Sequence, residues 1–189
     1  MTDYDNYFVY LSRRSRLGEI YRRAWLYPRL IRHLHGRTLD LGCGIGDLLA
    51  FRRNTIGVDI NPRTVEYCRS RGVDARLMDT DRLPFEGGEF DSVLMDNVLE
   101  HIERPEPLLA EVHRVIRPGG NLLIGVPGTR GWDSDADHKV RYDERSLRAI
   151  GERSGFRHCE TFHTPLWRSS WLDRRIRQYC IYASFERMV

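Results

Sequence analysis

Three glycines at alternate positions, Gly42, Gly44 and Gly46, restrict the fold of this chain more than any other feature. They follow a short apolar segment, residues 38–41, and precede residues 47–49, where a helix is expected to begin. Glycine has no Cβ atom, so the backbone can adopt positive φ and a ligand can lie directly against it. The free amides at the start of the helix favour an anionic group. The sequence therefore predicts a strand, a ligand-binding turn and a helix.

From residue 38 onward, short apolar segments alternate with segments of helical pattern. This alternation indicates repeated βαβ units and a mainly parallel sheet. A chain of 189 residues suits one compact domain of this kind. We expect strands near residues 37–41, 55–59, 75–78, 90–95, 121–125, 158–164 and 178–186, with the best-marked helices at 62–70, 107–116 and 144–154.

The residues before the first strand have a different pattern. Apolar residues recur at helical spacing from about residue 11 to residue 34, with arginines between them. Pro28 is expected to kink or divide this helix, because proline removes a backbone hydrogen bond. We therefore divide the chain into an N-terminal helical arm, residues 1–36, and a ligand-binding domain, residues 37–189. The arm is expected to cover the ligand cleft as a lid.

Acidic residues stand at the ends of two neighbouring strands. Asp40 lies two residues before the first glycine, and Asp59 ends the strand at 55–59. A parallel sheet would bring Asp59 beside the glycine turn, at the edge where open α/β sheets bind ligands. Its carboxylate can accept hydrogen bonds from both ribose hydroxyls, and each charge-assisted bond is worth about 1.5 to 3 kcal/mol. The glycine spacing differs from the G-x-G-x-x-G pattern of a dinucleotide site.

The ordered blocks between about residues 38 and 127 resemble the class I S-adenosylmethionine-dependent methyltransferases of the small-molecule type. The resemblance implies a doubly wound, Rossmann-like α/β fold with a seven-stranded, mostly parallel sheet whose last strand is antiparallel. It also implies that the chain is a methyltransferase that uses S-adenosylmethionine and releases S-adenosylhomocysteine. The matching blocks are the glycine turn after Asp40, the strand end at Asp59, Leu77-Met78-Asp79-Thr80, Met95-Asp96-Asn97 with Leu99-Glu100-His101, and Arg117-Pro118-Gly119-Gly120.

The resemblance also implies a set of cofactor-binding residues. In this family the first acidic residue lies near the methionine part of the cofactor, and the glycine turn passes beneath that part. The aspartate after the third strand faces the adenine amino group, and the start of the segment after the fourth strand borders the cofactor. The expected cofactor-binding residues are Asp40, Gly42, Cys43, Gly44, Gly46, Asp59, Ile60, Asp79, Thr80, Asp96 and Asn97.

A hydroxyl acceptor would benefit from a general base, whereas an amine or thiolate acceptor needs none. Candidates should follow the fourth and fifth strands, at the ligand-binding edge of the sheet. We rank His138, in the polar loop 132–142, before His101, for which a structural role is the alternative. Tyr142 is expected to position the acceptor. The dispersed histidines and cysteines have no metal-ligand spacing, so we expect no metal.

Two segments outside the shared blocks are expected to select the acceptor: the arm and residues 165–177, where Trp167 and Trp171 lie among arginines. Stacking and phosphate pairing favour a hydroxyl of a glycan or of a phosphorylated, lipid-linked saccharide. A quinone precursor, lipid or other metabolite is the alternative substrate. Residues 165–177 are expected either to contact anionic lipid peripherally or to form a solvated hairpin with packed tryptophans.

Other classes of function and partner are less consistent with the sequence. The net charge of +3 gives little support for nucleic acid as partner. The polar start of the chain lacks the pattern of a signal peptide, so we expect a cytoplasmic location. A cofactor-binding regulatory protein without transfer activity stays an alternative, because it would retain the same cofactor residues. The sequence predicts no oligomeric state.

Overall fold

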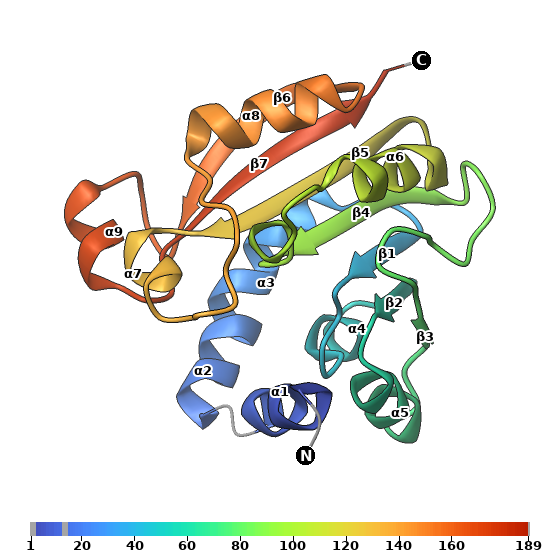
Figure 1. The fold of residues 1–189 in the computed structure, drawn as a ribbon, viewed down its shortest axis with the longest axis horizontal. Helices are drawn as coiled ribbons and strands as arrows, with labels where there is room; N and C mark the ends of the chain where they lie inside the picture. Colours follow the sequence, from blue (N-terminus) through green and yellow to red (C-terminus); the bar gives the residue numbers. More distant parts are fainter. Residues whose placement is uncertain (1–2, 13–14, 189) are drawn as a thin grey trace.

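The computed structural model describes residues 3–12 and 15–188, and its centre is a seven-stranded sheet in the order β3-β2-β1-β4-β5-β7-β6 (Figure 1). β7 runs antiparallel to its neighbours β5 and β6, whereas the other neighbouring pairs are parallel. The expected doubly wound fold with an antiparallel last strand is confirmed. The strands are β1 (Thr38–Leu41), β2 (Thr55–Asp59), β3 (Ala75–Leu77), β4 (Phe90–Asp96), β5 (Ile116–Pro127), β6 (Phe156–Thr164) and β7 (Cys180–Arg187).

Helices cover both faces of this sheet. Alternate residues of β4 point to opposite faces: Val93 packs with Leu109 and Leu147 in one core cluster, and Leu94 packs with Leu30 in another. The first cluster lies under α6 and α8, and the second lies under the N-terminal arm. The helices after β1 are α4 (Asp47–Phe51), α5 (Pro62–Ser70), the 3-10 turn η3 (Leu99–His101), α6 (Glu106–Val115), α7 (Thr129–Trp132), α8 (Glu144–Arg153) and α9 (Ser170–Arg175).

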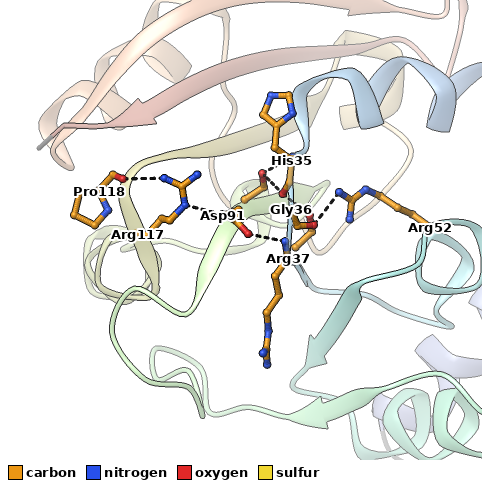
Figure 2. A network of polar contacts seen from close by, with 9 residues as sticks. His35, Gly36, Arg37, Arg52, Asp91, Arg117 and Pro118 are labelled. Atoms are coloured by element: carbon orange, nitrogen blue, oxygen red, sulfur yellow. Dashed lines mark hydrogen bonds and ion pairs between the residues drawn. The ribbon is translucent and has the colours of Figure 1, made fainter.

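Ion pairs and hydrogen bonds link the segments at the amino ends of β1 and β4, as Figure 2 shows. Asp91 accepts hydrogen bonds from the Arg37 amide at 2.7 Å and from Arg117 Nε at 2.6 Å. The Arg117 guanidinium lowers the pKa of the Asp91 carboxyl. Arg52 donates to the Gly36 carbonyl at 3.1 Å. The glycine turn lies at the opposite edge, which these contacts leave free for ligands.

The N-terminal arm begins earlier than residue 11, and Pro28 does not divide it, because helical turns continue without a gap over residues 16–33. Pro28 lies in the first turn of α3, directly after a π-helical turn that widens the helix, so helical structure continues through the proline. The arm consists of α1 (Asp3–Ser12), α2 (Arg16–Tyr21), the π-helical turn η1 (Arg22–Leu26), α3 (Tyr27–Leu30) and the 3-10 turn η2 (Ile31–His33).

The prediction of one continuous apolar face along the arm is only partly correct. Leu26, Leu30 and Leu34 are buried, but Leu17 and Ile20 are 79% and 60% exposed. The π-helical turn shifts the helical register, so residues before it no longer share a face with those after it. Within the described part of the chain, no helix has both the length and the apolar character needed to cross a membrane.

Candidate active site

The glycine turn after β1 presents bare main chain at the carboxyl edge of the sheet. Gly42, Gly44 and Gly46 have φ values of +74°, +53° and +75°. The Gly42 amide donates to the Val58 carbonyl at 2.8 Å, which fixes the turn to β2. A Cβ atom at Gly42 would lie 2.4 Å from Val98 Cγ2, so no larger residue fits there without a shift. The turn therefore needs glycine for conformation and for space.

Asp59, at the end of β2, lies against this turn. Its Oδ2 accepts a hydrogen bond from the Gly44 amide at 2.8 Å, and its Oδ1 accepts one from the Asn61 amide at 2.8 Å. Burial raises the pKa of Asp59, whereas the two backbone hydrogen bonds lower it. Each carboxylate oxygen keeps a second lone pair. Asp59 can therefore order the turn and still accept hydrogen bonds from ribose hydroxyls.

The carboxyl groups of Asp40 and Asp96 lie beside the same turn. Asp40 is 6% exposed in β1. Burial raises its pKa well above the usual value, and the nearby charges of Asp96 and Asp59 raise it further. The Tyr182 hydroxyl donates to Asp96 Oδ1 at 2.7 Å. A bound cation would offset the cost of these close carboxyl groups, so the site suits an ammonium or a sulfonium group.

The open rim of the cleft lies at the ends of β2 and β3. The Met78 amide donates to the Asp59 carbonyl at 3.1 Å, which holds the two strand ends together. Asp79 and Thr80 follow and are exposed, and Ile60 is 46% exposed. The structure thus brings Ile60, Asp79 and Thr80 to one rim beside Asp59, where an adenine ring next to the ribose would meet them.

Helix α1 lies over the glycine turn. A Cβ atom at Gly44 would lie 3.2 Å from Leu11 Cδ1. The Phe8 ring packs edge-on against Tyr67 of α5, with 5.4 Å between the ring centroids. In Figure 1, α1 lies beside α5 and below β1 and β2. The start of the arm therefore lies where a lid would lie, and the opening of that lid stays a prediction.

A 660 Å³ cavity adjoins the turn on the side of β4, β5 and β7. Leu11 connects the two sites, because the same side chain lies over Gly44 and lines this cavity. The expected cofactor residues Asp96 and Asn97 also lie on its wall. Other lining residues are Arg22 and Leu26 of the arm, Glu100, His101 and His138, and Arg177, Cys180 and Tyr182 near or in β7.

The two candidate bases, His101 and His138, meet on the wall of this cavity. Their ring centroids are 4.8 Å apart. His138 Nδ1 lies 2.9 Å from the Trp132 carbonyl, so Nδ1 donates and Nε2 keeps its lone pair. Burial and the neighbouring His138 lower the pKa of His101. Both imidazoles are therefore placed to act on a ligand in the cavity.

Glu100 is a functional candidate that the sequence interpretation gave no role. Its side chain is completely buried, and burial raises its pKa to about 8. Neither carboxylate oxygen has a hydrogen-bond partner from another described residue. The Lys139 and Val140 amides donate to the Glu100 main-chain carbonyl at 2.7 and 3.0 Å. These bonds bring the loop that contains His138 against η3.

Tyr142, which we expected to position the acceptor, is not among the residues that line the cavity of His101 and His138, and that role stays a prediction. It packs in the core under α6 and α8, and burial raises its pKa to about 12. It lines a separate 390 Å³ cavity together with Thr129 and His163. His138 and Tyr142 therefore line different cavities, although they are close in sequence.

Residues 39–124 match the model of a family described as a methyltransferase domain. A probable S-adenosylmethionine-dependent methyltransferase of Mycolicibacterium smegmatis is 36% identical over 71% of the chain and 58% of its own length. A probable tRNA methyltransferase 9B of Homo sapiens is 32% identical over 62% of the chain and 28% of its own length. The chain spans between 30% and 58% of the length of the first curated relatives that it matches.

A solved structure from Thermotoga maritima, described as a possible histamine N-methyltransferase, has the same fold. It superimposes with a TM-score of 0.77 and covers 99% of this chain and 100% of its own, at 19% identity. At this identity the similarity shows the fold alone. The strand order, the position of the glycine turn and the family match are all consistent with a methyltransferase domain.

Proposed function

The chain belongs to the class I S-adenosylmethionine-dependent methyltransferase family, whose cofactor is S-adenosylmethionine, and on this premise we propose that it methylates a hydroxyl of a glycan or of a phosphorylated, lipid-linked saccharide. The observation that supports methyl transfer is the continuity between the two sites. Leu11 lies over Gly44 and also lines the 660 Å³ cavity. A cofactor on the turn would thus have a cavity for an acceptor beside it.

The sulfonium group supplies an activated methyl group, so the protein mainly has to position the acceptor and exclude water. Leu11 and Leu26 shield the cavity from the arm side. His138 Nε2 has a free lone pair on the cavity wall and accepts the proton of the acceptor hydroxyl in this scheme. The His101 ring packs beside the His138 ring and helps to position it in this scheme.

Surface features near the cavity support a charged, ring-containing acceptor. Arg22 and Arg177 line the cavity, and guanidinium groups suit the recognition of phosphate. Trp167 and Trp171 are 68% and 60% exposed, so the alternative of a hairpin with packed tryptophans is wrong. Trp171 projects because α9 buries Leu172 instead, and Trp167 lies before this helix. Exposed tryptophans with nearby arginines suit sugar stacking and contact with a membrane surface.

The arm and the tryptophan segment form one connected surface. Trp25 of the arm donates from Nε1 to the Pro165 carbonyl at 2.5 Å. The Arg175 guanidinium lies over the Trp171 ring, 5.2 Å from its centroid. This surface would hold the cavity near a lipid-linked acceptor.

We expect the double variant Trp167→Ser and Trp171→Ser to bind vesicles of anionic phospholipid at least about tenfold more weakly. Each tryptophan that enters the membrane interface contributes up to about 3 kcal/mol to the free energy of binding. Co-sedimentation with vesicles at fixed salt measures the change. Calorimetry with S-adenosylhomocysteine is the control and should give the wild-type affinity. Equal vesicle binding by the variant and the wild type would contradict the membrane contact.

Turnover tests the acceptor class directly. Incubation with labelled S-adenosylmethionine is expected to release S-adenosylhomocysteine and to label lipid-linked saccharides, whereas matched amounts of tRNA and of quinone precursors stay unlabelled. The relatives' names include a tRNA methyltransferase, so tRNA is the most important alternative acceptor to test. Label in tRNA or in quinones would overturn the saccharide acceptor. Cofactor binding without release of product for any acceptor would favour the regulatory alternative.

A further inference from the structure

Three potential metal ligands meet on the wall of the acceptor cavity. Glu100 and His101 belong to η3, and His138 comes from the loop after α7. One ligand atom from each of the three lies within 4.8 Å of the others. All three residues also line the 660 Å³ cavity. The cluster therefore combines two imidazoles and one carboxylate at a place that a small molecule can reach.

Glu100 lacks the positive or donating partner that a buried carboxylate needs. Its side chain is fully buried, and both of its oxygens are without a hydrogen-bond partner from another described residue. Burying such a group uncompensated costs several kcal/mol, so buried carboxylates are normally paired or coordinate a metal. The nearest complementary groups are the two histidines, and His138 Nε2 lies 3.9 Å from Glu100 Oε1. At this distance His138 makes no hydrogen bond to the carboxylate.

The hydrogen bonds around His138 match those of a metal ligand. Nδ1 lies 2.9 Å from the Trp132 carbonyl, and the Trp132 ring stacks on the imidazole with 4.9 Å between centroids. A histidine that binds a metal usually donates its other ring N–H to a carbonyl or a carboxylate, which fixes the tautomer and the ring orientation. The hydrogen bond at Nδ1 therefore leaves Nε2, which lies 3.9 Å from Glu100 Oε1, as the ring nitrogen that could bind a metal.

We propose that Glu100, His101 and His138 bind a divalent metal ion of the zinc type, with at least one coordination position open to the acceptor cavity. Two His ligands and one carboxylate suit zinc, and they also suit manganese or iron. Ligand atoms about 2.1 Å from a tetrahedral ion are about 3.4 Å apart. The cluster would thus have to contract by little more than about 1 Å, which side-chain rotation can supply.

The ion could activate the acceptor through its open coordination position, and this role rests on the proposed function. An acceptor hydroxyl whose oxygen binds the ion becomes more acidic and releases its proton to water in the cavity. The oxygen lone pair then forms the bond to the methyl carbon, and the carbon–sulfur bond breaks with its electrons remaining on sulfur. His138 is a ligand in this form, so the ion replaces it as the group that activates the hydroxyl.

The metal site is tested by binding to the full chain after treatment with a chelator. Calorimetry with zinc, and the visible spectrum with cobalt, are expected to show one bound ion per chain. Glu100→Gln and His138→Ala should weaken zinc binding at least about 100-fold, because each removes a direct ligand. His158→Ala is the matched control, since His158 lies in β6 and contacts Thr161. Wild-type and Glu100→Gln chains that bind zinc equally would overturn the site.

Thermal melting separates ligand loss from misfolding. Glutamine has the size of glutamate without its charge, so Glu100→Gln is expected to melt no lower than wild type in chelator. Zinc should then raise the melting temperature of the wild type and of His158→Ala, but not that of Glu100→Gln. Equal increases in all three would show adventitious binding and overturn the proposal. Normal zinc binding with no methylation of saccharides would contradict the proposed saccharide acceptor and leave the metal site supported.

Discussion

Replacing Gly44 by valine is expected to lower the affinity for S-adenosylhomocysteine at least about 100-fold. Gly44 lies in the turn at φ +53°, and its amide donates to Asp59. A valine would place two methyl groups over the main chain where the cofactor is expected to lie, and its Cβ would already approach Leu11 to 3.2 Å. Calorimetry with S-adenosylhomocysteine measures the loss.

The matched control for this variant is Gly72→Val. Gly72 also has a positive φ, +74°, but a Cβ atom there would meet nothing within 4 Å. Both variants carry the same kind of backbone strain, of about 1 to 2 kcal/mol, and only one obstructs the cleft. Gly72→Val should therefore bind the ligand normally while losing similar stability. Equal affinity in the two variants would contradict a cofactor site on the turn.

Replacing Asp59 by asparagine is expected to weaken binding of both S-adenosylhomocysteine and methylthioadenosine by about 10- to 100-fold, because both ligands have a ribose and each charge-assisted bond is worth about 1.5 to 3 kcal/mol. The Asp59 carboxylate accepts from the Gly44 and Asn61 amides on its two oxygens. An asparagine keeps only one of these acceptors and turns an N–H donor toward the other amide. Calorimetry with the two ligands measures the effect.

Asp40→Asn distinguishes the roles of the two acidic strand ends. Asp40 is buried in β1, and the family resemblance assigns it to the methionine part of the cofactor. Methylthioadenosine lacks the amino-acid group, so Asp40→Asn should weaken binding of S-adenosylhomocysteine and leave methylthioadenosine unchanged. The same loss for both ligands in both variants would contradict the assignment of ribose to Asp59 and of the ammonium to Asp40.

The elements with strong local signals could be predicted from the sequence. Helix α5 has its expected bounds because Asn61 caps it, accepting from the Arg63 amide, and Pro62 occupies its first turn. Strand β2 also has its expected bounds, residues 55–59. In both segments the local pattern and the tertiary contacts favour the same structure.

Elements controlled by long-range pairing could not be predicted as well. Strand β5 begins at Ile116 instead of residue 121, although Pro118 and the two glycines after it are strong turn signals. Ile116 pairs with Phe90 and Asn121 pairs with Ser92, with a register shift between them. The strand therefore continues through the irregular segment, because pairing with β4 on both sides of it overrides the turn signal.

The candidate site was predictable where its residues are close in sequence to a glycine or a strand end. The cluster of Glu100, His101 and His138 was not, because metal ligands were sought at short spacing along the chain. Main-chain hydrogen bonds from Lys139 and Val140 to Glu100 bring the third member into place. The exposure of Trp171 likewise depends on which side of α9 packs, which the spacing of apolar residues left open.

A crystal structure of the chain with S-adenosylhomocysteine tests the cofactor site most directly. We expect the ligand to lie on the main chain of Gly42 and Gly44, with both ribose oxygens within hydrogen-bond distance of Asp59 and the sulfur directed into the 660 Å³ cavity. A complex in which Leu11 stays packed over the turn and the ligand binds elsewhere, with no contact to Asp59, would contradict a methyl-transfer site at this edge of the sheet.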